Sequence, residues 1–296
     1  MDYVIETRDL TKRFGTFGAV SALNMRIGRG QITGFLGRNG AGKSTTIKML
    51  LGMTHPTSGS GTLLGRSITD PKQNVEARRS VAYCGEDKQL YAYMTVQQLI
   101  RFTASFYPDW RSEAADRLLH QFQLPLGRKV RALSKGMRTK LALLLALARR
   151  PSLLILDEPT EGLDPVSIEQ LLETLAGLPG EGATVFFSSH QISEVERIAD
   201  RVCIIDRGQL AADLSLDEIR QDHRRITLGF ARQPPEHVFE MPGVRLIETS
   251  GRQMVLLASH GAEAVIECAR NFGAVAVDVA PLSLRELFLE TVKEHS

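Results

Sequence analysis

The chain has 296 residues, of which 43% are hydrophobic and 24% charged; these are ordinary values for a globular protein, and the length suggests about two domains. Its 36 basic and 34 acidic residues nearly balance, which disfavours a protein that mainly coats nucleic acid or anionic lipid, and also a disordered chain. The three cysteines lie far apart without metal-ligand spacing, so they exclude a zinc module or a disulfide scaffold and indicate a reducing cytosol.

We expect neither a membrane-spanning helix nor a signal peptide in this sequence. The longest apolar run, Leu141 to Ala148, is closed by two arginines and is much shorter than the about 20 residues that a spanning helix needs. The N-terminus has no basic segment followed by an apolar core. The chain is therefore expected to be soluble by itself, with docking on a membrane through a partner still open to it.

The first part of the chain alternates between short apolar strands and amphipathic helices. Capping signals mark two helix starts, because Thr95 is followed three residues later by Gln98, and Asp164 directly precedes Pro165. Apolar strands that alternate with helices indicate an α/β fold with a mainly parallel sheet covered on both faces. Strands are predicted at residues 3–10, 19–27, 31–36, 81–84, 153–156, 183–187 and 202–205, and helices around 47–51, at 95–106, 115–122 and 134–149, and from 164.

The character of the sequence changes after about residue 215, where we predict a domain boundary. Residues 1–215 are expected to form the first domain, with a helical subdomain at about 87–150. Residues 216–296 are expected to form a small α+β domain with an accessory or regulatory role. Within it, strands are predicted at 226–230, 244–248, 253–257 and 274–279, helices at 262–272 and from 283, and a loop at 233–236.

A glycine-rich segment between a predicted strand and a predicted helix has the GxxxxGK[ST] spacing of a phosphate-binding loop. Glycines let the backbone wrap a phosphate with its N–H groups pointing inward, and the following helix adds its positive end. Lys43 is expected to reach the β- and γ-phosphates, and Ser44 to ligate Mg²⁺. The plain alternative is a strand-to-helix turn without a ligand. The predicted nucleotide-binding residues are Gly37, Arg38, Asn39, Gly40, Ala41, Gly42, Lys43, Ser44 and Thr45.

Two adjacent carboxylates follow the apolar strand at 153–156, where an open α/β sheet places its chemistry. Neighbouring residues of a strand face opposite ways, so Asp157 and Glu158 are expected to have different roles. Asp157 is the natural Mg²⁺ ligand, either direct or through water, and Glu158 is placed to polarise an attacking water. The alternative is a solvated strand end before a turn.

Five motifs in one order make the chain resemble the ATPase subunit of an ATP-binding-cassette (ABC) transporter. The resemblance covers about residues 3–215. It implies a P-loop ATPase fold that combines a mainly parallel core sheet with an antiparallel β subdomain and a helical subdomain. The motifs are the phosphate loop, a signature-like Leu133-Ser134-Lys135-Gly136-Met137, the acidic strand end at Glu158, the segment Gly162-Leu163-Asp164, and Ser189-His190.

The resemblance implies ATP and Mg²⁺ as ligands and a second ATPase subunit, a homodimer in the simplest case, as partner. Two cassettes pack head to tail, so that each ATP contacts the phosphate loop of one chain and Ser134 and Gly136 of the other. His190 is expected at the γ-phosphate beside Glu158, and Phe14 on the adenine. Each residue also has a plain alternative: Ser134 as a helix N-cap, His190 as a helix cap, and Phe14 as a core aromatic.

The sequence departs from the family pattern at two places. Glu86 stands where the family commonly has a Gln that reaches Mg²⁺, and an acid there ligates metal more strongly but adds negative charge near phosphate. The signature has Lys135 and Met137 in place of Gly and Gln. These variants are similar to those of bacterial single-cassette exporters, which implies separate membrane-spanning permease subunits and a location on the cytoplasmic face of the membrane. The stretch from Asp87 to Trp110 is the expected docking region.

Two other functions share some of these motifs. A non-transport ABC ATPase in a soluble complex has the same site, although such proteins usually carry two cassettes or a long coiled-coil insertion. A small-molecule kinase or GTPase has the same phosphate loop, but the chain lacks an Asn-Lys-x-Asp guanine motif. A transport ATPase is therefore the favoured function, and no nucleic-acid partner is expected.

Overall fold

The structure is a computed structural model that describes residues 3–87, 89–232 and 236–294. The chain forms two compact units, one up to Asp213 and one from Leu214 onward, whereas the sequence analysis places the boundary at residues 215 and 216. None of the helices within the described residues combines the length and apolar character needed to span a bilayer.

An antiparallel sheet opens the first unit, with its strands in the order β2-β1-β4-β5. The long first two strands pair from Tyr3 opposite Gly28 to Phe14 opposite Phe17, and Gly15, at φ +58°, makes the turn between them. Both strands extend beyond their predicted ends. The strands of this sheet are β1 (Tyr3–Phe14), β2 (Phe17–Gly28), β4 (Ser58–Leu63) and β5 (Arg66–Ser67).

The second sheet of this unit is the predicted parallel core, with its strands in the order β10-β9-β3-β8-β7-β6. Strands β9, β3, β8, β7 and β6 run parallel, and every residue of β3, β7 and β8 is buried, as their unbroken apolar runs predict. The α/β fold class is therefore confirmed. The strands are β3 (Ile32–Leu36), β6 (Val81–Cys84), β7 (Leu153–Asp157), β8 (Thr184–Ser189), β9 (Arg201–Asp206) and β10 (Gln209–Ser215).

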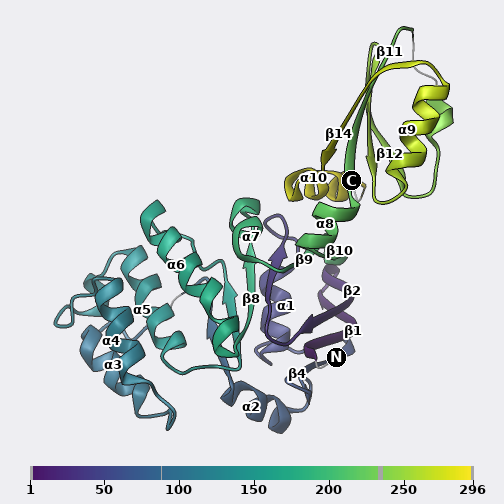
Figure 1. Cartoon of the computed structure of the whole chain (residues 1–296). Coiled ribbons are helices and arrows are strands. Elements are labelled where there is room, and N and C mark those ends of the chain that lie inside the picture. The colour runs from purple at the N-terminus through teal and green to yellow at the C-terminus, as the bar shows by residue number, and fades with distance from the viewer. Residues whose placement is uncertain (1–2, 88, 233–235, 295–296) are drawn as a thin grey trace. The chain divides into compact units, whose positions relative to one another are not determined.

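Helices flank this sheet, and three of them gather into a helical subdomain (α3, α4 and α5 in Figure 1). The predicted capping box at Thr95 and the Asp164 cap are both present. Helix α2, which the sequence analysis did not predict, begins with Asp70 as its cap and Pro71 as its first residue. The helices of this unit are α1 (Lys43–Leu50), α2 (Pro71–Arg79), α3 (Val96–Ala104), α4 (Ser112–Gln121), α5 (Lys135–Leu147), α6 (Pro165–Gly177) and α7 (Ile192–Ile198), with short 3₁₀ turns at Val130–Ala132 and Pro179–Glu181.

The core of the first unit includes residues of the antiparallel sheet, the parallel sheet and helix α1. Phe35 on β3 and Phe186 on β8 are fully buried, and their ring centroids lie 5.3 Å apart. Burial of such side chains stabilises the fold by about 1.5–3 kcal/mol each. Strand β3 leads into the phosphate loop, and β8 leads into His190. This packing therefore fixes where both of these segments begin.

The second unit is an antiparallel sheet with its strands in the order β12-β13-β11-β14. Its core includes Leu228, Leu256 and Val265. With helix α9 before the last strand and a 3₁₀ turn in place of a first helix, the element order is that of a βαββαβ unit. Of the predicted loop, residues 233–235 lie outside the described residues. The elements are α8 (Leu216–Asp222), β11 (Arg224–Phe230), a 3₁₀ turn (Glu236–Phe239), β12 (Val244–Ser250), β13 (Gln253–Ala258), α9 (Ala262–Asn271), β14 (Ala274–Pro281) and α10 (Leu284–Glu294).

Candidate active site

The glycine-rich loop between β3 and α1 has two positions at which a side chain would clash with the surrounding backbone. Gly42, the N-cap of α1, has φ +108°, and a Cβ there would lie 2.6 Å from the carbonyl oxygen of Ala19. A Cβ on Gly37 would lie 2.5 Å from the carbonyl oxygen of Ile205. No side chain caps the first turn of α1, so its leading N–H groups are left for an anion.

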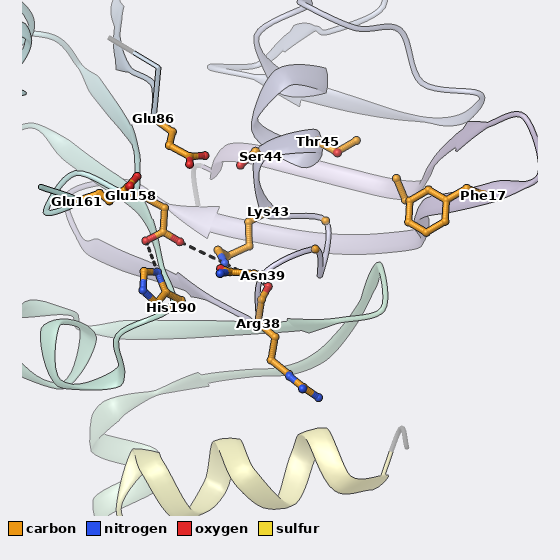
Figure 2. Close-up of a pocket in the computed structure, with 13 residues that line it drawn as sticks. Phe17, Arg38, Asn39, Lys43, Ser44, Thr45, Glu86, Glu158, Glu161 and His190 are labelled. Carbon is orange, nitrogen blue, oxygen red and sulfur yellow. Dashed lines mark hydrogen bonds and ion pairs between the residues drawn. The ribbon is translucent and has the colours of Figure 1, made fainter. Parts of the chain in front are cut away.

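A cavity of about 600 Å³ lies over this loop. Figure 2 shows residues from β2, the phosphate loop, the end of β6, the end of β7 and the end of β8 converging on it. A volume of this order is typical of a small-molecule site. The lining residues are Phe17, Ala19, Arg38, Asn39, Gly40, Gly42, Lys43, Ser44, Thr45, Glu86, Glu158, Glu161 and His190.

Glu158 lies between two potential cations in this cavity (Figure 2). Its Oε1 is 3.2 Å from Nζ of Lys43, and its Oε2 is 2.8 Å from Nδ1 of His190. Lys43 and Glu158 are both buried, whereas the imidazole of His190 is half-exposed. Glu158 also has φ +49°, a left-handed backbone that is uncommon for residues other than glycine. The sharp turn after β7 thus aims this carboxylate back into the cavity.

Lys43 is held ready for a phosphate by carbonyl groups of its own loop. Its Nζ donates to the carbonyl oxygen of Gly37 at 2.7 Å and to that of Arg38 at 3.4 Å. Together with Glu158, these acceptors hold the ammonium group at the floor of the cavity. The side chain of Arg38 points away from Lys43 and Glu158 (Figure 2), so of these two loop cations it is Lys43 that faces the carboxylate.

Asp157 faces away from its neighbour, as alternation along a strand requires. It is 1% exposed, and its Oδ1 accepts a hydrogen bond from Oγ of Ser188 at 2.6 Å; the same Oγ accepts from the backbone N–H of Glu158. Burial, and then the charge of Asp157, raises the pKa of Tyr83 to about 12, so this phenol stays neutral. Ser44 and Glu86 line the cavity, whereas Asp157 is absent from its lining.

The signature-like segment does not line the cavity of its own chain. Ser134 is the N-cap of α5, and its Oγ accepts from the backbone N–H of Met137 at 3.2 Å. A Cβ on Gly136 would lie 2.9 Å from the carbonyl oxygen of Gly162, so the start of α5 packs directly on the loop that follows Glu158. Lys135 adds an ion pair of 2.5 Å to Glu161 in that loop.

The aromatic ring that lines the cavity is not the one predicted to contact adenine. Phe14 is absent from the residues that line the cavity, and its half-exposed ring lies under the Nζ of Lys12. Phe17, across the hairpin turn, lines the cavity instead. Ala19 and Glu161 also line the cavity and are not among the predicted site residues. Glu161 lies three residues after Glu158, and this short spacing is the one signal for it in the sequence.

Comparisons with known proteins show the family to which the chain belongs. Residues 20–161 match the family model described as ABC transporter. The bacitracin transport ATP-binding protein BcrA of Bacillus licheniformis is 38% identical over 228 residues, which cover 76% of this chain and 74% of BcrA. The ABC transporter ATP-binding protein YtrB of Bacillus subtilis is 26% identical, over 97% of both chains.

A solved structure described as the ATP binding subunit of an ABC transporter has the same fold, with a TM-score of 0.67 and 32% identity; the match covers 74% of this chain and 92% of that one. The relatives and the phosphate loop lead to the same conclusion. The chain belongs to the ATP-binding subunits of ABC transporters, and it binds and hydrolyses ATP.

Proposed function

We propose that this chain works as a homodimer that encloses two ATP molecules and drives transport through separate membrane-spanning subunits. One observation carries the proposal: the cavity lining contains Lys43 and Glu158 but neither Ser134 nor Gly136. Ser134 and the first turn of α5 nevertheless form an anion site of the kind that a helix start provides. A second copy, packed head to tail, supplies that anion site to the nucleotide held by Lys43.

ATP binding starts from the phosphate loop. The backbone N–H groups at the start of α1 and the ammonium group of Lys43 receive the β- and γ-phosphates. Because Lys43 already lies buried beside its carbonyl acceptors, little side-chain entropy remains to be lost on binding. The ring of Phe17 lines the cavity and offers a face on which the adenine stacks.

Hydrolysis uses Glu158 as the base that accepts the proton of the attacking water. The hydrogen bond from His190 orients one carboxylate oxygen, and the positive charge of Lys43 stabilises the negative charge that develops on the transferred phosphoryl group. Closure of the dimer removes water from the cavity, which strengthens both interactions. Opening of the dimer after hydrolysis releases ADP and phosphate and transmits the motion to the membrane subunits.

The residues present fit a bound Mg²⁺. The hydroxyl of Ser44 and the carboxylate of Glu86 both line the cavity, and such oxygen donors are the ligands that Mg²⁺ prefers, together with water and phosphate. Asp157, held by Ser188, supplies negative charge behind them. When bound, the ion neutralises phosphate charge and offsets the extra negative charge of Glu86.

An exposed aromatic cluster in the helical subdomain is the proposed docking surface for the permease. It comprises Tyr91, Tyr93, Phe102 and Phe106. Their rings contact one another at centroid distances of 5.0–6.0 Å, although each ring stays substantially exposed. Exposed aromatic groups of this kind mark interaction sites. Docking there places the chain on the cytoplasmic face of the membrane. The relative named for bacitracin transport supports a transport role, and export is the direction that we propose.

The dimer mechanism is tested by Ser134→Arg. An arginine at this helix start blocks the borrowed anion site, so we expect ATP hydrolysis to stop while ATP binding to the isolated chain is unchanged. Wild-type specific activity should fall on dilution, because dimers dissociate. Ser112→Arg, which places the same charge at the start of α4, is the matched control. A specific activity independent of protein concentration, or full activity of Ser134→Arg, would rule out the dimer.

A further inference from the structure

Glu194 on α7 is a buried carboxylate next to the site that the mechanism above does not use. It is 4% exposed, and its Oε2 accepts a hydrogen bond from Oγ of Ser189 at 2.8 Å. Ser189 is fully buried, ends β8 and directly precedes His190. The Oγ of Ser189 also accepts from the backbone N–H of Gln191 at 2.9 Å. Glu194 therefore holds the backbone on both sides of His190 through one serine hydroxyl.

The same carboxylate faces the loop that carries Glu158. The hydroxyl of Thr160, two residues after Glu158 and itself buried, also stabilises the ionised form of Glu194. Since His190 is bonded to Glu158 at 2.8 Å, a series of contacts runs from Glu194 through Ser189 and His190 to Glu158.

Helix α7, which carries Glu194, packs tightly on the central sheet. A Cβ on Gly34 of β3 would lie 2.5 Å from Cγ1 of Val195, the residue after Glu194. The helix thus packs directly on the backbone of the strand that leads into the phosphate loop. A side chain anchored on α7 is therefore fixed relative to the loop that holds Lys43.

The buried carboxylate of Glu194 destabilises the fold, which indicates that it has a role besides packing. Burial raises the pKa of Glu194, and the nearby charge of Glu158 raises it further, whereas the hydroxyls of Thr160 and Ser189 lower it. Its Oε1 is buried without a hydrogen-bond partner among the described residues. A buried polar atom without a partner destabilises a protein, so stability alone does not explain a carboxylate at this position.

We propose that Glu194 is a positioning residue that holds His190, and through it Glu158, in the geometry needed for hydrolysis. The inference rests on the proposed roles of Glu158 and His190. A small displacement of a catalytic group is costly, because about 1 Å of misplacement lowers a rate by about 100-fold. Removal of the Glu194 side chain should let the catalytic groups shift by less than this, and we therefore expect kcat to fall by about tenfold.

The test measures ATP hydrolysis and nucleotide affinity of the full chain. We expect Glu194→Ala to lower kcat about tenfold with ATP affinity and KM nearly unchanged, because the phosphate loop is untouched. Glu194→Gln should keep most of the activity, since its amide oxygen still accepts from Ser189. Ser189→Ala should lower kcat as Glu194→Ala does. The control is Ser193→Ala, an exposed position of the same helix, which should behave as wild type.

A double-mutant cycle distinguishes positioning through His190 from a general structural effect. In a His190→Ala background, Glu194→Ala should lower kcat little further; reductions that multiply would overturn the inference. If Glu194→Ala fails to fold, Ser189→Ala takes its place in the cycle. If Glu194→Ala and Ser189→Ala both keep the wild-type kcat while His190→Ala is impaired, this inference is refuted and the proposed function is unaffected. Wild-type kcat in His190→Ala would instead refute the proposed role of the histidine.

Discussion

Replacing Glu158 with Gln is the sharpest perturbation of the proposed chemistry. The change keeps the shape of the side chain and removes the one negative charge that lies between Lys43 and His190. An amide cannot accept a proton from the attacking water. Loss of a general base typically lowers a rate by about 10²–10⁴-fold, which corresponds to about 3–5 kcal/mol in the activation barrier. We expect a fall in kcat within this range.

The same substitution should affect ATP binding in the opposite direction. Oε1 of Glu158 lies 3.2 Å from the ammonium of Lys43, and two charges at that separation attract by about 5 kcal/mol at an effective dielectric of about 20. Desolvation of the buried pair cancels most of this attraction. The remainder competes with the phosphates for Lys43. Glu158→Gln should therefore bind ATP as tightly as wild type, or up to about tenfold (~1.4 kcal/mol) more tightly.

Steady-state phosphate release measures the first effect and equilibrium nucleotide titration the second. Light scattering with ATP should show that the variant stays dimeric, because it binds ATP without consuming it. Glu76→Gln makes the same chemical change at an exposed ion pair with Arg79 and serves as the control. Turnover at the wild-type rate would refute the assignment of Glu158 as the base. Weaker ATP binding would refute the competition between Glu158 and phosphate for Lys43.

Two further substitutions test the nucleotide cavity. Phe17→Ala should weaken ATP affinity by about 1–3 kcal/mol, the usual value of a base stacked on an aromatic ring. Phe14→Ala should leave the affinity unchanged. If a nucleotide titration shows the reverse order, Phe14 is the adenine contact. Gly42→Ala should abolish ATP binding and lower the free energy of unfolding by about 1–3 kcal/mol or more, because it forces a side chain into a left-handed backbone against Ala19. Gly177→Ala, whose Cβ would meet no atom within 4 Å, should be neutral or slightly stabilising in thermal unfolding.

The sequence predicts the parallel core well because its strands are buried on both faces. The apolar run at 153–156 and the one ending at Leu36 are typical of strands that helices cover on both faces of a parallel sheet. Strand β4 was missed for the opposite reason: its sequence, Ser58–Leu63, is rich in Ser and Gly, which favour turns. It forms because the edge of β1 is there to pair with it. Tertiary context overrides local preference at such an edge.

Some residues of the candidate site can likewise be predicted from the sequence, and others cannot. Lys43 and Glu158 follow from a motif and a strand end, because a fixed spacing along the chain determines their chemistry. The aromatic contact does not, since Phe14 and Phe17 flank one hairpin turn and only the fold shows which ring lines the cavity. Glu194 has no sequence signal of its own. Its importance depends on the end of β8 and the loop after β7 meeting beside α7.

The left-handed backbone of Glu158 has a consequence for engineering this protein. Such a conformation costs a residue with a side chain about 1–3 kcal/mol relative to an unstrained backbone, whereas glycine adopts it freely. The amino acid that would best relax this turn is thus one that carries no carboxylate. Thermal robustness and catalytic power make opposite demands on a single residue, so stabilising changes should be sought elsewhere in the molecule.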